Sequence, residues 1–311
     1  MDTHSLLIIV FGSLFLVVAL AHLIAFRLAR RSAPDDPVIT NLNERIYAWW
    51  IILISVSAAF LFGKTGVILL FALCSFAALR EFFTIAPTKR GDHMAIWLSF
   101  FLFLPLQYYM VYLEWYSMAT VLIPVYAFLS LPVVAALRND TTHYLERIAD
   151  TQWGLMICVF SLSHVPMLLT LNIKSFSGKS ILLAVFLLVV VQASDVLQYV
   201  WGKLCGRHKV APNLSPSKTW EGLVGGIISA SVLSALLSFI TPFSWYEAAL
   251  FGFIICLCGF FGGLVMSAIK RDRGIKDWGS SIEGHGGFLD RLDSVIFSAP
   301  VFFHLVRYFW T

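Results

Sequence analysis

Charged residues are scarce in this sequence. Lys, Arg, Asp and Glu make up 13% of its 311 residues, whereas hydrophobic residues make up 59% and the mean hydropathy is +0.82. Soluble domains carry roughly 25% charged residues, which they need to cover their surface with polar groups. The shortage therefore excludes an ordinary soluble protein and indicates that a lipid bilayer surrounds most of the chain.

Recognisable cysteine patterns are also missing. The count of five is odd, and no pair has the spacing of a zinc site. Four of the five lie inside apolar runs, so we interpret them as packing residues rather than disulfides or metal ligands. The cysteines are Cys74, Cys158, Cys205, Cys256 and Cys258.

No long polar segment interrupts the chain. A membrane-spanning helix needs about 20 mostly apolar residues, and about ten such runs are present. They lie near 5–26, 46–62, 66–84, 95–113, 118–137, 152–172, 180–201, 222–240, 247–268 and 294–310. Backbone polar groups in lipid must be paired within the segment, so we predict an all-α, polytopic integral membrane helix bundle. We divide it into N-terminal membrane helices, 1–175, and a C-terminal part, 176–311, that carries polar loops 202–221 and 269–293.

The first apolar run has two interpretations. Residues Ala19–Ala21 resemble a signal-peptidase site. However, residues 1–4 hold no Lys or Arg, whereas Arg27, Arg30 and Arg31 follow the run. Because basic residues after a hydrophobic segment tend to remain in the cytoplasm, we expect an uncleaved first span.

Basic residues are distributed unequally between the two sides of the predicted bundle. Of the 22 Lys and Arg, 18 fall on one side, in segments 27–45, 80–94, 138–151, 202–221 and 269–293. Cytoplasmic loops carry the excess of Lys and Arg. We therefore predict that both polar loops are cytoplasmic and that both termini lie on the opposite side, in a membrane that we expect to be the bacterial inner membrane.

Residues 267–294 combine both signs of charge. Asp290 and Asp293 are placed to share one face of a helix beginning near Phe288, and two such carboxylates could hold Mg²⁺. The basic residues Lys270, Arg271, Lys276 and Arg291 suit phosphate oxygens, and His285 lies among three glycines. Acidic metal ligands beside phosphate-binding cations are what phosphoryl or nucleotidyl transfer requires.

An ordinary juxtamembrane loop is the alternative for this segment. Its Lys and Arg would then set topology, and its Asp residues would cap helices. We prefer that interpretation for Asp272 and Arg273. For Asp277, His285, Asp290 and Asp293 we prefer the catalytic one.

The second polar segment begins within an apolar run. Asp195 follows residues 181–191, where an ionisable side chain is costly and is a functional candidate by default, although a neighbouring Ser or Lys could satisfy it. Residues 215–222 indicate a turn that leads into a helix. Ser215, Ser217, Lys218 and the first helical amides make a plausible anion site, although alone this is only a capping motif.

These two segments resemble the signatures of the phosphatidate cytidylyltransferase (CDP-diacylglycerol synthase) family. Residues 267–293 read SAIKRDRGIKDWGSSIEGHGGFLDRLD, similar to that family's Ser, K-R, K-D, P-G-H-G-G, D-R and final D. Residues 215–222, SPSKTWEG, are similar to its S-P-x-K-T-x-E-G, preceded by an Asp and a Tyr as Asp195 and Tyr199 are here. The resemblance is specific over about 185–300, and upstream only Arg80-Glu81-Phe82 adds to it.

The resemblance implies a membrane nucleotidyltransferase that makes CDP-diacylglycerol and pyrophosphate from CTP and phosphatidate. The implied catalytic residues are Asp277, His285, Asp290, Arg291 and Asp293. The implied substrate-binding residues are Ser215, Ser217, Lys218, Glu221, Lys270, Arg271 and Lys276. Mg²⁺ would be held by Asp290 and Asp293 with Asp277 or Asp195, and a second cation stays open.

The implied partners are CTP, phosphatidate or a related lipid phosphate, and membrane lipids. We expect no nucleic-acid partner, and a homodimer stays open. Glu283 stands where the family usually has Pro, Gln198 where Ala is usual and Gln192 where an aromatic residue is common. These departures bear on the lipid more than on the chemistry.

Other functions remain as alternatives. One is a CTP-dependent enzyme that acts on another lipid phosphate or a lipid alcohol. A transporter would use Asp195 and His164 as pathway residues, and a membrane scaffold would need neither the Asp pair nor the Gly-rich run. For His164 itself we expect a hydrogen-bonded histidine beside a kink at Pro166. For Gly225–Gly226 and Gly262–Gly263 we expect close helix packing rather than ligand binding.

Overall fold

The computed structural model describes residues 2–30, 37–279 and 286–311. Within these ranges ten helical segments are long and apolar enough to cross a membrane, which confirms the predicted all-α membrane bundle. The segments are Thr3–Ala29, Leu42–Leu61, Gly63–Ile85, Arg90–Tyr112, Tyr116–Ala136, Tyr144–Thr170, Ile181–Cys205, Trp220–Ile240, Trp245–Asp272 and Leu289–Trp310.

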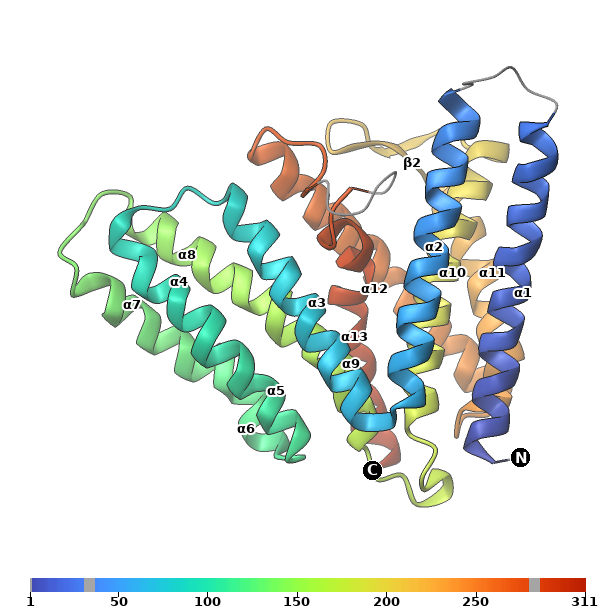
Figure 1. The fold of residues 1–311 in the computed structure, drawn as a ribbon, viewed down its shortest axis with the longest axis horizontal. Coiled ribbons are helices and arrows are strands. Elements are labelled where there is room, and N and C mark those ends of the chain that lie inside the picture. The colour runs from blue at the N-terminus through green and yellow to red at the C-terminus, as the bar shows by residue number, and fades with distance from the viewer. Residues whose placement is uncertain (1, 31–36, 280–285) are drawn as a thin grey trace.

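Seven of the segments are built on one continuous α-helix each. These helices are α1 (Thr3–Ala29), α2 (Pro37–Leu61), α3 (Gly63–Ile85), α10 (Ile181–Cys205), α11 (Trp220–Leu236), α12 (Trp245–Asp272) and α13 (Leu289–Trp310). Figure 1 shows that they alternate in direction along the bundle. Many of their outward side chains are large and apolar, as expected of a surface that faces lipid.

Three segments are α-helices interrupted by a wider π-helical turn. They are α4 (His93–Leu98) with α5 (Leu104–Tyr112), α6 (Tyr116–Val121) with α7 (Phe128–Ala136), and α8 (Tyr144–Leu155) with α9 (Leu162–Met167). A proline lies in or shortly after each interruption, at Pro105, Pro124 and Pro166. Because proline has no N–H, it removes a helical hydrogen bond and favours such local widening.

A short antiparallel hairpin interrupts the helical pattern. Strand β1 (Lys209–Ala211) pairs with β2 (Ser215–Thr219), with Lys209 opposite Thr219. The Thr219 hydroxyl accepts a hydrogen bond from Gly222 N at 3.1 Å and caps α11. The sequence predicted the turn and the cap but not the strands.

The polar connections gather at one end of the bundle. In Figure 1 the β-hairpin and the C-terminal end of α12 lie at the top, whereas both termini lie at the bottom. This is the arrangement that the alternation of ten spans predicts. Which end faces the cytoplasm stays a prediction.

The packing crosses the predicted division at 175/176. In Figure 1, α4 to α8 lie on one side, α1, α2, α10 and α11 lie on the other, and α13 lies between them. The His164 ring of α9 is 5.3 Å from the Phe303 ring of α13. The division into two parts stays a prediction, and the two parts share one hydrophobic core.

Of the two ring nitrogens of His164, one has a hydrogen-bond partner among the described residues. Its Nδ1 donates to the Phe160 carbonyl at 2.8 Å, but its buried Nε2 has no hydrogen-bond partner among the described residues. The expectation of a hydrogen-bonded histidine is therefore wrong for one of the two nitrogens. The surrounding rings, including that of His304 with centroids 5.2 Å apart, contact His164, but no donor among the described residues reaches the Nε2 lone pair.

Candidate functional site

Asp290 lies in the first turn of α13 and is almost fully engaged by neighbours. Its Oδ1 accepts from Lys270 Nζ at 2.6 Å, and both side chains are largely buried, at 7% and 12% exposed. Its Oδ2 accepts from the backbone N–H groups of Trp278 and Gly287 at 2.9 and 3.0 Å. Charge-assisted bonds of this kind fix a carboxylate firmly, so Asp290 organises the segment around it as well as contributing charge.

Asp293 and Asp195 lie close together although they come from different helices. The Ser294 hydroxyl donates to Asp195 Oδ1 at 3.0 Å and lies 3.4 Å from Asp293 Oδ1. The Ser294 backbone N–H also donates to Asp293 Oδ1 at 2.7 Å. Asp195 thus has a serine as its hydrogen-bond partner, as the non-functional interpretation of Asp195 predicted. The same serine joins Asp195 to Asp293.

Lys218 brings the second motif segment to the first. From β2 its ammonium reaches α12, where it lies 4.8 Å from the Phe260 ring centre and donates to the Phe260 carbonyl at 3.4 Å. A side chain on Gly263 would meet Lys218 Nζ at 2.5 Å and Asp293 Oδ2 at 3.5 Å. Gly263 therefore admits the ammonium between the two segments, and its role goes beyond the helix packing that the sequence predicted.

Burial lowers the pKa of Lys218 from the ordinary lysine value of 10.5. Removing an ammonium from water disfavours its charged form. The carboxylates of Asp293 and Asp195 oppose this effect, and the Lys270 ammonium adds to it. Lys218 is therefore a cation held beside two carboxylates and a second cation.

Other predicted residues lie away from this cluster or are used locally. Glu221 accepts from the backbone of Arg207 and His208 and from the His208 ring at 2.6 Å, so it fixes the start of the hairpin. Arg271 is exposed and donates to the Ile275 carbonyl. Ser215 is buried in the hairpin. Exposed residues at the same end are Ser217, Lys276 and Asp277.

The remaining predicted residues are Arg291 and His285. Arg291 is partly buried in α13, one residue after Asp290. His285 lies outside the described residues, as does Glu283. The structure thus brings together Lys218, Asp195 and Asp293 at one point and Lys270 and Asp290 at another, with α13 joining them.

Two contacts from the first half of the chain were not foreseen as parts of the site. Glu81 of α3 accepts hydrogen bonds from the backbone N–H groups of Phe288 and Leu289. Asp150 of α8 pairs with Arg273 at 2.6 Å, and the topological role that we preferred for Arg273 stays a prediction. The sequence feature that could have pointed to Glu81 is its position, as an acidic residue, at the end of an apolar run.

The donor set fits a hard divalent cation at Asp195 and Asp293. Mg²⁺ commonly takes one or two protein carboxylates and completes its shell with water and substrate phosphates. No group of three or more His, Cys, Asp or Glu able to hold a metal occurs in the part of the chain that the structure describes. A carboxylate pair that leaves coordination positions for phosphate oxygens is consistent with that finding.

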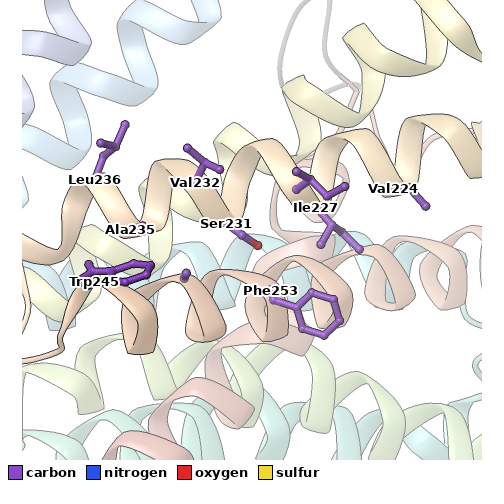
Figure 2. Close-up of a pocket in the computed structure, with 10 residues that line it drawn as sticks. Val224, Ile227, Ser231, Val232, Ala235, Leu236, Trp245 and Phe253 are labelled. Atoms are coloured by element: carbon purple, nitrogen blue, oxygen red, sulfur yellow. The ribbon is translucent and has the colours of Figure 1, made fainter.

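An apolar groove of about 580 Å³ lies elsewhere, between α11 and α12. Figure 2 shows its lining, which includes Val224, Trp245, Phe253 and the hydroxyl of Ser231. None of its residues carries a charge. The groove therefore cannot neutralise a phosphate, and the charged cluster is the better candidate for chemistry.

The family is settled by a comparison over most of the chain. The model of the cytidylyltransferase family matches residues 43–309. The chain belongs to the cytidylyltransferase family. Both motif segments lie within the matched region, as does Glu81.

Individual relatives divide into two kinds. The chain is 38% identical over 299 residues, 96% of each chain, to a protein of Escherichia coli K12 named "Uncharacterized protein YnbB". It is 43% identical over 118 residues, 37% of each chain, to the phosphatidate cytidylyltransferase of Mycobacterium leprae. It is 44% identical over 137 residues to that of Helicobacter pylori, which covers 44% of this chain and 50% of that protein. The matches to relatives with a stated activity are thus partial.

Proposed function

We propose that this membrane cytidylyltransferase transfers the cytidylyl group of CTP to phosphatidate. A phosphate oxygen of the lipid attacks the α-phosphorus of CTP and forms the new P–O bond. The bond from the α-phosphorus to the oxygen that bridges to the β-phosphorus breaks, and pyrophosphate leaves. The products are CDP-diacylglycerol and pyrophosphate.

The meeting of the two motif segments at Gly263 carries this proposal. Lys218 approaches Asp293 there, and Asp195 joins through Ser294. A transfer between two phosphates needs cations for both substrates and carboxylates for a metal within one small volume. A capping motif or a topology loop needs no such convergence of opposite charges from separate segments.

We assign phosphate binding to the basic residues of the two segments. Lys218 and Lys270, both partly buried, would contact the triphosphate. Arg271, Lys276 and Arg291 would divide between the triphosphate and the lipid phosphate, and His285 would position a phosphate. A base is scarcely needed, because a phosphate dianion is already nucleophilic near pH 7.

The carboxylates would hold the cation that this chemistry uses. Asp195 and Asp293 are the proposed ligands, with Asp290 and Asp277 as the further acidic residues of the site. A bound Mg²⁺ would supply charge neutralisation for the phosphates and the leaving group. We place the site on the cytoplasmic face of a bacterial inner membrane, where CTP is found.

A different lipid phosphate is the second candidate. Gln198, where the resembled family usually has Ala, lies in the contact between α10 and α11: a side chain on Gly226 would meet its Cγ at 2.3 Å. Its Nε2 donates to Ser194 Oγ, one residue before Asp195. Because this departure leaves every proposed metal ligand in place, we infer that it bears on the acceptor lipid more than on the chemistry.

Pyrophosphate release tests the proposal. Purified protein in detergent is given CTP, Mg²⁺ and phosphatidate, and reactions without lipid serve as blanks. We expect release that requires all three components, that is lost in Asp293→Asn and Asp290→Asn, and that persists in Asp272→Asn. Asp272 is the matched control because it is exposed in the same segment.

Each other outcome has a defined meaning. Release with another lipid phosphate or a lipid alcohol, but not with phosphatidate, would retain the transferase and replace the acceptor. Full activity in Asp293→Asn would refute the metal role of the carboxylate. Failure of every lipid, together with failure to bind CTP, would favour the transporter.

A further inference from the structure

Glu81 contacts the motif segment from the opposite half of the chain. It lies near the end of α3, is 7% exposed, and accepts from Phe288 N and Leu289 N with one oxygen each, both at 3.0 Å. The first N–H groups of a helix have no partner within the helix. Glu81 therefore supplies acceptors to the start of α13, where the helix dipole also favours a negative charge.

The described residues on both sides of 280–285 close around this carboxylate. A side chain on Gly279 would meet Glu81 Oε1 at 3.1 Å, and one on Gly287 would meet Oε2 at 2.5 Å. Next to Glu81, the Phe82 ring stacks on Trp278 with centroids 5.7 Å apart. Glu81 and Phe82, which are consecutive in α3, thus contact segment 267–293 both before residue 280 and after residue 285.

Asp290 joins the same two parts from within the segment. Its Oδ2 accepts from Trp278 N and Gly287 N. Residues 278–279 and 286–289 are thus held between two buried carboxylates, Glu81 on one side and Asp290 on the other. The placement of Asp290, and of Asp293 one turn further on, depends on both.

We infer that Glu81 is a positioning residue of the transferase site, which sets the start of α13 and with it the placement of Asp290 and Asp293. The inference rests on the proposed function, because it assigns Glu81 a part in the same reaction. Glu81 itself touches backbone N–H groups of the segment and acts on the substrates only through it.

Replacement by glutamine removes the charge while keeping the shape. The amide of Gln can offer one carbonyl oxygen, but its NH2 group would face the second backbone N–H and leave that donor unpaired. Misplacement of reacting groups by about 1 Å can cost about 100-fold in rate. We expect Glu81→Gln to lower kcat by about 10- to 100-fold and to change the KM for CTP much less, since Lys218 is held by α12.

Hydrogen exchange provides a readout that needs no activity. The peptide covering residues 286–292 should exchange faster in Glu81→Gln than in the wild-type protein. Peptides from α11 should be unchanged. Glu81→Asp keeps the charge on a shorter side chain, so we expect intermediate exchange and an intermediate kcat.

Glu247→Gln is the matched control. Glu247 also accepts from a helix-start N–H, that of Ser244, together with the Ser244 hydroxyl, but at the beginning of α12 and at the other end of the bundle. Its replacement should lower the apparent Tm in detergent, as the loss of a helix cap does. It should leave kcat and the exchange of 286–292 unchanged.

The outcomes separate this inference from the proposed function. Wild-type exchange of 286–292 in Glu81→Gln would overturn the inference, whatever the substrate. Faster exchange with wild-type kcat would show a structural contact without a positioning role and would overturn it too. If the wild-type protein releases no pyrophosphate from CTP and phosphatidate, the acceptor proposal fails, and kcat is compared with the lipid that does react.

Discussion

Individual residues at this site carry more than one role. Asp290 accepts from Lys270 and from two backbone N–H groups, so a substitution there removes charge and a structural support together. Asp293 and Asp195, by contrast, meet at a single hydroxyl of Ser294. Substitution of Asp293 is therefore the cleaner test of a metal ligand.

The lowered pKa of Lys218 predicts an alkaline limit on activity. Lys218 binds phosphate only as a cation, and the pH dependence of kcat/KM reports groups of the free enzyme. We expect kcat/KM for CTP to fall as pH rises through a pKa below the ordinary lysine value of 10.5, because burial disfavours the ammonium. In Lys218→Arg, which stays charged, the fall should move to higher pH.

The same shift has a defined sign for stability. Between the lowered folded pKa and 10.5, the unfolded state binds more protons at Lys218 than the folded state does. The contribution of this group to the free energy of unfolding therefore rises with pH across that window.

A wild-type profile of kcat/KM that stays flat up to the ordinary lysine range would contradict the assignment of Lys218 to phosphate binding.

At the scale of elements, glycines set how closely helices and side chains approach. Gly262 and Gly263 are neighbours in α12 but face different partners. A side chain on Gly262 would meet the Asp293 backbone oxygen at 2.6 Å and Phe297 Cβ at 3.0 Å. On Gly263 it would meet the flexible end of Lys218 at 2.5 Å.

This difference predicts opposite effects of two alanine substitutions. Gly262→Ala should push α12 from α13 and destabilise the protein by about 1–3 kcal/mol. Gly263→Ala should leave stability near wild type, because only the Lys218 ammonium must shift, and should lower the rate of pyrophosphate release. Apparent Tm in detergent and initial rates measure the two effects, and the reverse pattern would count against this view of Gly263.

At the scale of the whole molecule, the alternation of the spans and the contacts between distant parts of the chain contribute differently to the site. The ten spans alternate, so the motif connections share one end of the bundle (Figure 1). The site is then completed across the bundle, by Glu81 at the start of α13 and by Asp150 on Arg273. Both halves of the chain are therefore needed to shape one site.

Cys205 is a native reporter of orientation. It is exposed at the end of α10, next to the hairpin, whereas Cys158 and Cys256 are buried. We expect a membrane-impermeant thiol reagent to label Cys205 in inside-out vesicles but not in right-side-out vesicles. Lys174→Cys in a Cys205→Ser background should show the opposite preference, because Lys174 is exposed in the connection before α10. Labelling of Cys205 in right-side-out vesicles would reverse the proposed orientation.

The sequence by itself determined the class of the protein, the number of spans and the segments that carry its chemistry. Hydropathy decides the spans because a helix must satisfy its backbone within itself in lipid. The mixed charges of 267–293 and the pattern of 215–222 identified Lys218, Lys270, Asp290 and Asp293 as candidates, because binding phosphates and a metal requires those residue types.

Only the tertiary structure decided which of these residues meet and what supports them. Ser294 joins Asp195 from 99 positions away, and Phe288 donates to Glu81 across 207 positions. Neither contact follows from a local period or a short motif. Helix packing brings the groups together, and a buried carboxylate such as Glu81 must then find donors wherever the fold places them. The same reason gives Gly263 its place beside Lys218, since only the approach of the Lys218 side chain from β2 to α12 defines the space that a side chain there would fill.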